Sequence, residues 1–275
     1  MGVPLYFFLA CFATICVVRA QDPLEIIRKS VSVDNDYNKR AQDYTLTQKS
    51  VEKNIDSDGK VKSTSSKTKD IFFIDGDRYS RLVERDGKPL SPDEEKRERE
   101  RFEKRLAAGK AEAHRGNRAA EREKRRQQQR EFLKELPEAF VFRMLPDEII
   151  DGRAVWAIQG DPRPDYRPRA SEAKLFSKFR GKLWVDKGDY EWVKVDLESI
   201  DTVSFGFFIA RLSKGAHFVA EQTRLNDEVW LPKRIRVRYD ARLALLKHLT
   251  GEVEETMYNF RKFQADSRII SVTEH

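Results

Sequence analysis

The segment from Lys233 to Leu246 constrains the fold most, because apolar and charged side chains alternate along it. Its apolar positions are Ile235, Val237, Tyr239, Ala241, Leu243 and Leu245, and the residues between them are mostly arginines. A period of two puts successive side chains on opposite faces of a β-strand, so one face is apolar and the other is solvated. The segment exceeds the usual strand length of about five or six residues, and long antiparallel strands twist and curl. The pattern therefore predicts a curved antiparallel sheet.

Short runs rich in β-branched and aromatic residues begin after Asp43, and pairs of turn residues separate them. The pairs are Asp58-Gly59, Asp75-Gly76, Asp86-Gly87, Asp151-Gly152, Lys187-Gly188, Lys214-Gly215 and Asn226-Asp227. Such residues accept the positive φ angles of tight hairpin turns. We count about ten or eleven strands without regular helix alternation. The predicted fold class is mainly β (α+β), with an antiparallel sheet curved into a half-barrel and covered by helices.

The N-terminus predicts export. Leu5 to Val18 form an apolar run, and Ala20 suits the position before a signal-peptidase cut, so residues 1–20 are interpreted as a cleavable signal and 21–275 as one domain. An uncleaved anchor is the alternative, but a run of about 14 apolar residues is short for a bilayer span of roughly 20. We expect a monomeric periplasmic protein. Cys11 and Cys16 lie in this segment, so the mature chain has no cysteine.

Residues 91–136 interrupt the β-rich sequence with a charged helical arm. Ser91, Pro92 and Glu94 form a helix start with a capping box. The arm holds 15 Lys plus Arg and 11 Asp plus Glu, a net charge of +4 out of +6 for residues 21–275. Apolar residues cluster toward its two ends, so we expect it to project into solvent from its base. Its candidate contacts to an envelope membrane surface, another polyanion or a protein partner are Lys124, Arg125, Arg126 and Arg130. The alternative is a solubilising helix without a ligand.

The residues give no sign of catalysis. The four histidines lack metal-ligand spacing, and nucleophile elbows and phosphate or dinucleotide loops are missing from the sequence. We expect no catalytic residue, no metal, no cofactor and no enzymatic activity. Binding of nucleic acid is also not expected, because glutamates interleave with the basic residues at helical spacing. A hydrolase whose carboxylates are distant in sequence stays an alternative.

The apolar face of such a sheet needs cover. Leu24, Ile27 and Val31 predict an amphipathic helix ending near Arg40, and a short helix is expected at 170–179. These helices are too small for the whole face, which favours an apolar cavity over a fully packed core. The candidate ligand-binding residues are Leu183, Val185, Val193, Val195, Ile235, Val237, Tyr239 and Leu243.

Three short motifs carry a resemblance to a known family. They are Gly181-Lys182-Leu183-Trp184-Val185-Asp186 followed by Trp192-Val193-Lys194-Val195, then Trp230-Leu231-Pro232 before the arginine-rich strand, and Tyr258 to Phe263. The chain resembles the LolA/LolB-like outer-membrane lipoprotein-sorting proteins over most of residues 22–275. This resemblance implies a half-barrel that carries lipid or lipoprotein acyl chains without covalent chemistry, and the lack of a lipid-attachment cysteine favours the soluble carrier type. An interaction or regulatory module that acts through the basic arm is the alternative function.

Overall fold

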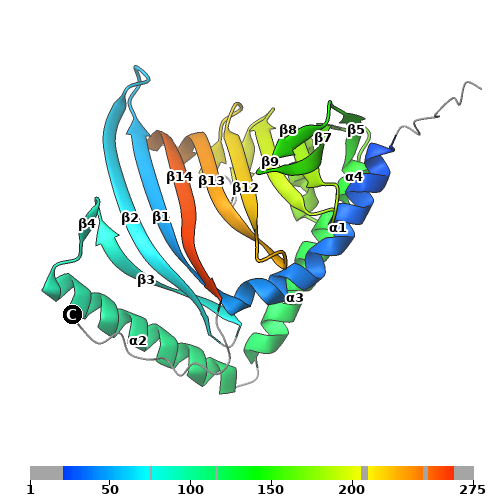
Figure 1. Ribbon diagram of the computed structural model, residues 1–275. Coiled ribbons are helices and arrows are strands. Elements are labelled where there is room, and N and C mark those ends of the chain that lie inside the picture. The colour runs from blue at the N-terminus through cyan, green and yellow to red at the C-terminus, as the bar shows by residue number, and fades with distance from the viewer. Residues whose placement is uncertain (1–20, 75, 115–116, 206–209, 244–246, 263–275) are drawn as a thin grey trace, which may run out of the picture.

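The computed structural model describes residues 21–74, 76–114, 117–205, 210–243 and 247–262. The predicted signal segment therefore lies outside the described residues. One large antiparallel sheet carries the fold, and its helices lie along one side of it (Figure 1). The helices are α1 (Pro23–Arg40), α2 (Pro92–His114), α3 (Asn117–Lys134) and α4 (Leu136–Ala139), with 3₁₀ turns η1 (Ala41–Asp43) and η2 (Glu172–Lys178).

The sheet has 14 strands in the order β4-β3-β2-β1-β14-β13-β12-β9-β8-β7-β5, and it does not close into a barrel. β6 pairs with β7, β10 with β11, and β11 with β13. The strands of the first half are β1 (Tyr44–Ile55), β2 (Val61–Ile74), β3 (Asp77–Arg85), β4 (Lys88–Pro89), β5 (Phe140–Met144), β6 (Glu148–Ile150) and β7 (Arg153–Pro162). Those of the second half are β8 (Phe179–Asp186), β9 (Trp192–Ser199), β10 (Val203–Phe205), β11 (Ala210–Leu212), β12 (His217–Leu225), β13 (Val229–Leu243) and β14 (Lys247–Lys262).

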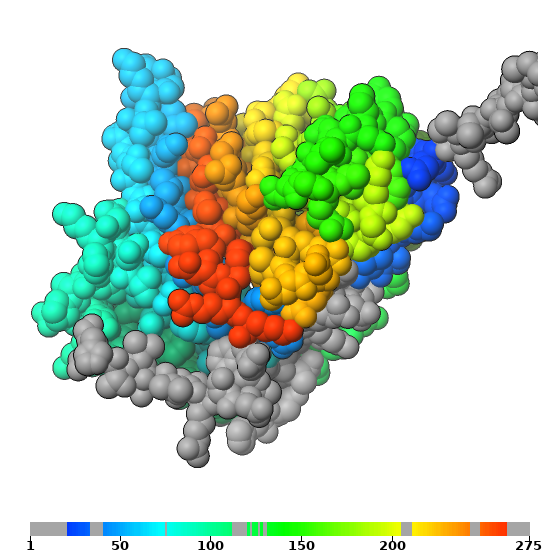
Figure 2. Space-filling model, in the orientation of Figure 1, coloured from blue at the N-terminus to red at the C-terminus, as the bar shows by residue number. Residues whose placement is uncertain are grey.

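The predicted curved antiparallel sheet is confirmed, with more strands than the ten or eleven expected. The additional strands include β4, β6, β10 and β11, which are only two or three residues long. Such short pieces lack an apolar run that a sequence pattern could reveal. The tip of the β1–β2 hairpin projects beyond the neighbouring strands (Figures 1 and 2).

Three of the predicted turn pairs, Asp86-Gly87, Asp151-Gly152 and Asn226-Asp227, have positive φ angles at both residues, whereas neither residue of Lys187-Gly188 does. Asp86 and Gly87 have φ angles of 51° and 73°, and Asn226 and Asp227 have angles of 49° and 55°. Two successive residues with positive φ form a type I′ turn, whose twist matches that of antiparallel strands. These pairs therefore set the hairpins β3–β4 and β12–β13.

The helix α1 defines an inner face of the sheet. Ile26 and Ile27 of α1 are buried against inner-face side chains, which are Trp156, Ile158, Leu183 and Val185. A second cluster lies on the outer face and consists of Val155, Ala157, Trp184, Val193 and Trp230. The core near β7, β8 and β9 is therefore buried on both faces of the sheet.

A β-bulge sends Val193 to the outer face. Val185 pairs with Trp192 and Trp184 pairs with Lys194, so Val193 is the additional residue of β9. Beyond the bulge Val195 pairs with Leu183 on the inner face. Val193 and Val195 thus lie on opposite sides of the sheet although they are two residues apart.

The first helix of the charged arm does not project into solvent, which corrects the expectation from its sequence. α2 lies along the edge strand β3, where Phe102 contacts the rings of Phe72 and Tyr79 at centroid distances of 5.9 and 6.3 Å. Glu98 is only 8% exposed and accepts a hydrogen bond from the Leu82 N–H at 3.2 Å. Arg105 donates to the Ser80 carbonyl at 2.7 Å. Side chains of α2 therefore occupy the backbone groups that another strand would pair with.

Within the described ranges, none of the helices has both the length and the apolar composition that crossing a bilayer requires.

Candidate functional site

An apolar cavity of about 300 Å³ lies between the inner face of the sheet and the helices α3, α4 and η2. The helices contribute Phe132, Leu133, Leu136, Leu175 and Phe176. The sheet contributes Phe140, Phe142, Ile158, Leu183, Trp192, Val195 and Leu197. Phe179, Gly160, Gly181 and Lys182 complete the lining, and Lys182 is the one charged side chain among the described residues that form it.

Two paired glycines form part of the cavity floor. Gly160 of β7 lies opposite Gly181 of β8 in the ladder. A Cβ atom on Gly181 would lie 2.3 Å from the Asp196 carbonyl oxygen, which is a backbone overlap. A Cβ atom on Gly160 would approach only the rings of Phe142 and Phe140, at 3.2 and 3.4 Å. The absence of side chains at both positions brings the strands close together and leaves space above them.

Aromatic rings form the wall of the cavity opposite the sheet. Phe132 of α3 stacks on Phe176 of η2 at a centroid distance of 4.4 Å, and Phe140 meets Phe176 edge-on at 5.7 Å. The wall therefore joins two segments that are distant in the chain, because α3 precedes β5 and η2 follows β7.

Glu135 fixes this wall. Its carboxylate is buried at 3% exposure and accepts hydrogen bonds from the Tyr166 hydroxyl at 2.6 Å and from the N–H groups of Arg169 and Ala170 at 2.9 and 2.8 Å. Burial raises the pKa of Glu135, but these hydrogen bonds outweigh it and the pKa lies below its usual range. An ionised carboxylate thus connects the loop after β7, which contains Tyr166, Arg169 and Ala170, to the junction of α3 and α4.

The structure separates the eight candidate residues into groups. Leu183 and Val195 line the cavity, and Val185 is buried beside them under α1. Val193 belongs to the outer cluster. Ile235, Val237 and Tyr239 of β13 are half-buried and lie outside the cavity, and the side chain of Leu243 is outside the described set. A ligand-binding role for these residues stays a prediction.

The inner face connects the cavity with β13. Leu197 pairs with Phe218, Phe218 with Val237, and Val237 with Val253, so one apolar row crosses four strands. The row ends at Glu52, which pairs with Val253. The candidates on β13 therefore continue the cavity floor toward the part of the sheet that the helices leave uncovered (Figure 1).

Sequence reasoning missed most of the cavity wall. Phe132, Leu133 and Leu136 line the cavity, although they belong to the charged arm that was expected to project into solvent. Their clustering at the end of an otherwise charged helix was the available signal, since an isolated apolar group on such a helix must be covered.

The basic candidates all belong to α3. Lys124 and Arg125 are exposed, whereas the side chains of Arg126 and Arg130 are outside the described set. The arginines of β13 differ from them, because Arg236 pairs with Glu254 at 2.9 Å and Arg238 with Glu252 at 3.8 Å on the outer face. Cross-strand ion pairs with β14 thus engage these two arginines of the arginine-rich strand.

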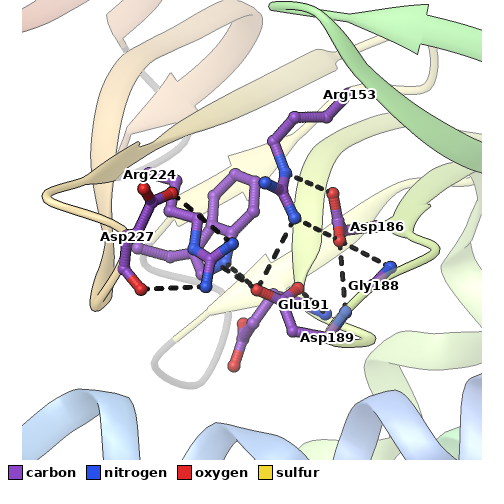
Figure 3. A network of polar contacts seen from close by, with 8 residues as sticks. Arg153, Asp186, Gly188, Asp189, Glu191, Arg224 and Asp227 are labelled. Atoms are coloured by element: carbon purple, nitrogen blue, oxygen red, sulfur yellow. Dashed lines mark hydrogen bonds and ion pairs between the residues drawn. The ribbon is translucent and has the colours of Figure 1, made fainter.

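A polar network joins three hairpin turns at one end of the sheet (Figure 3). Asp186, which is 1% exposed, accepts hydrogen bonds from Arg153 at 2.6 and 2.7 Å and from the Gly188 N–H at 2.8 Å. Asp189 accepts from the Trp230 indole at 3.0 Å and lies 3.6 Å from Arg224. Burial raises the pKa of Asp186, but Arg153 and the backbone N–H groups lower it below its usual range. The paired charges indicate a structural role.

A polar groove of about 420 Å³ crosses the outer face behind the cavity. Its lining residues are Arg143, Gln159, Asp161, Arg180, Gly181, Lys182, Asp196, Glu198 and His217. Its three carboxylates each face a basic partner, since Arg143 pairs with Asp161, Arg180 with Glu198, and His217 lies 2.6 Å from Asp196. The described residues that line the groove include no hydroxyl or thiol nucleophile. Among the described residues, no group of three His, Cys, Asp or Glu could hold a metal ion.

Comparison with known proteins returned no matching family model and no matching curated protein. Solved structures do match. An outer membrane lipoprotein-sorting protein domain from Vibrio parahaemolyticus has 12% identity and a TM-score of 0.37, covering 90% of this chain and 94% of that one. A DUF1329 family protein from Desulfovibrio piger has 10% identity and a TM-score of 0.32, covering 89% and 93%. A LolA superfamily protein from Nitrosomonas europaea has 8% identity and a TM-score of 0.31, covering 89% and 94%.

The matching solved structures include lipoprotein-sorting proteins, which is the family that the motifs resemble, but likenesses with identities and TM-scores this low carry no argument about function. The function is therefore derived from the chain's own cavity and charges.

Proposed function

We propose that this protein is a periplasmic carrier that holds the acyl chain of a lipid or lipoprotein in its cavity. The observation that carries the proposal is the composition of the cavity lining, in which one charged residue accompanies apolar side chains and glycines. A volume of about 300 Å³ is at the lower end of ligand pockets and suits a narrow ligand.

The expected driving force is desolvation of the ligand. Each buried methylene contributes about 0.8 kcal/mol, so a chain of about ten methylenes contributes on the order of 8 kcal/mol before the costs of association. Such binding needs neither a cofactor nor a catalytic group. The candidates on β13 would contact the part of a longer chain that extends along the inner-face row.

Native mass spectrometry of residues 21–275 with extracted envelope lipids tests the proposal. We expect retained lipid and a decrease in retention for Leu175→Trp, because Leu175 lines the cavity and a larger ring there fills it. Lys174→Trp is the matched control, because it adds the same ring at the exposed neighbouring position of η2. Absence of retained lipid, or equal retention by both variants, would contradict the carrier proposal.

The second candidate function is an interaction or regulatory module that acts through the arm. The exposed basic residues of α3 favour it. Deletion of 91–136 is an unsuitable test, because it removes both the cavity wall at Phe132 and Leu133 and the cover of β3. Charge substitutions on α3 separate the two roles.

A further inference from the structure

The positive charge of the arm is concentrated in one of its two long helices. α2 contains seven Lys or Arg and seven Asp or Glu, so its net charge is zero. α3 contains seven Lys or Arg and three Asp or Glu, so its net charge is +4. The excess positive charge of the arm therefore lies on α3, whereas α2 packs along the edge strand β3.

The charged part of α3 faces solvent. The side chains described between Ala120 and Glu131 are all exposed. Lys124 and Arg125 form no ion pair with any residue whose side chain is described. The basic residues of the sheet differ, since Arg153 and Arg180 both have carboxylate partners. α3 thus presents cationic side chains that are available to an external anion.

The other end of the same helix is part of the cavity. Phe132 and Leu133 line it, and Phe132 stacks on Phe176. Lys124 precedes Phe132 by eight residues in one continuous helix, which is about 12 Å along the axis. An anion bound at Lys124 would therefore lie close to the wall that encloses the apolar ligand.

We propose that α3 docks the protein on the anionic surface of a lipid bilayer, which places the cavity beside the membrane that supplies or receives the acyl chain. This inference rests on the proposed carrier function. A row of lipid phosphates complements an exposed cationic helix, and each Lys or Arg near such a surface strengthens binding about fivefold. α3 has no apolar residue other than alanine before Phe132, so the contact is electrostatic attachment without insertion of the helix.

Vesicle sedimentation with residues 21–275 tests the docking. One set of vesicles contains phosphatidylglycerol and phosphatidylcholine, and the other contains phosphatidylcholine alone. We expect binding to the first set only, and weaker binding as the salt concentration rises. K124Q/R125Q removes two cationic side chains and should weaken binding about 25-fold. K96Q/R99Q removes the same charge from exposed positions of α2 and should bind as the unchanged protein does.

Equal weakening by both variants would overturn the assignment to α3, because net charge alone would then explain the attachment. Absence of binding to the anionic vesicles at low salt would overturn the docking itself and would point to an acidic protein as the partner of α3. Retention of extracted lipid by the unchanged protein, measured without vesicles, reports the carrier function separately. Retained lipid without vesicle binding refutes the docking only, and α3-dependent vesicle binding without retained lipid refutes the carrier function only.

Discussion

Replacement of Asp186 by alanine tests the energetic role of the polar network in Figure 3. The change removes the acceptor of two hydrogen bonds from Arg153 and of the N–H groups of Gly188 and Asp189, at 2.8 and 3.2 Å. The Arg153 side chain is 29% exposed, so water reaches part of the guanidinium after the change. The two backbone groups belong to the β8–β9 turn and lose their acceptor.

We expect a loss of about 3–5 kcal/mol in the free energy of unfolding. Removal of one partner from a buried ion pair costs about this much, because the remaining charge and donors are left without an acceptor. For a domain of this size the melting temperature should fall by about 10 °C. Such a loss is a large part of a typical total stability of about 5–15 kcal/mol.

Urea unfolding followed by tryptophan fluorescence measures the effect, and Glu198→Ala is the control. Glu198 also receives two hydrogen bonds from one arginine, Arg180, but the two side chains are 44% and 53% exposed. An exposed pair contributes less than about 1 kcal/mol. Equal effects of the two substitutions would refute the assignment of stability to burial of the network.

The pH dependence has a definite sign. The folded pKa of Asp186 is lower than its value in the unfolded chain, so ionisation stabilises the folded state above the unfolded pKa of about 3.9. This contribution is lost as the pH falls through the folded pKa. The difference in stability between the unchanged protein and D186A should therefore decrease below about pH 4.

Three further substitutions test individual contacts. Gly181→Ala should lower the free energy of unfolding in urea titrations by about 3 kcal/mol or more, because the new Cβ overlaps the Asp196 carbonyl. Gly160→Ala is the control, since its Cβ meets only aromatic rings that can move, and it should lower the free energy of unfolding by less. Glu98→Ala leaves the Leu82 N–H of β3 uncovered, and we expect self-association in light scattering that Lys104→Ala does not cause. Glu135→Gln should make the free energy of unfolding decrease less steeply as the pH falls below about 4.3. The lowered pKa of Glu135 stabilises the folded state only while the carboxylate is ionised. The same pH dependence of stability in the variant and the unchanged protein would contradict this.

The sequence predicted those helices and turns whose structure is determined by residues close together in the chain. The period of Leu24, Ile27 and Val31 located α1, and turn pairs such as Asp86-Gly87 located the hairpins. Both signals act within a few residues, where side-chain spacing and φ preferences determine the structure.

The parts that sequence reasoning could not supply depend on distant contacts. The sequence analysis placed Val193 and Val195 together among the candidate ligand-binding residues. The bulge that puts them on opposite faces is a property of the β8–β9 pairing. The position of the apolar residues at the ends of the arm predicted that it projects into solvent, but Glu98 and Arg105 of α2 bind the backbone of β3. The cavity likewise combines η2 with α3, and three strands, β5, β6 and β7, separate these two elements in the chain.

The pairing of β1 with β14 has a consequence for folding order. These neighbours run from Tyr44 paired with Lys262 to Ile55 paired with Thr250, so about 200 residues separate their partners. β1, β2, β3 and α2 can assemble from local contacts, but one edge of β1 stays open until β14 has been synthesised. Folding of the complete sheet is therefore expected to be slow, and shortening the chain before β14 would leave β1 as an edge prone to aggregation. β14, the last long strand to be synthesised, thus fills the gap between β1 and β13 in the interior of the sheet.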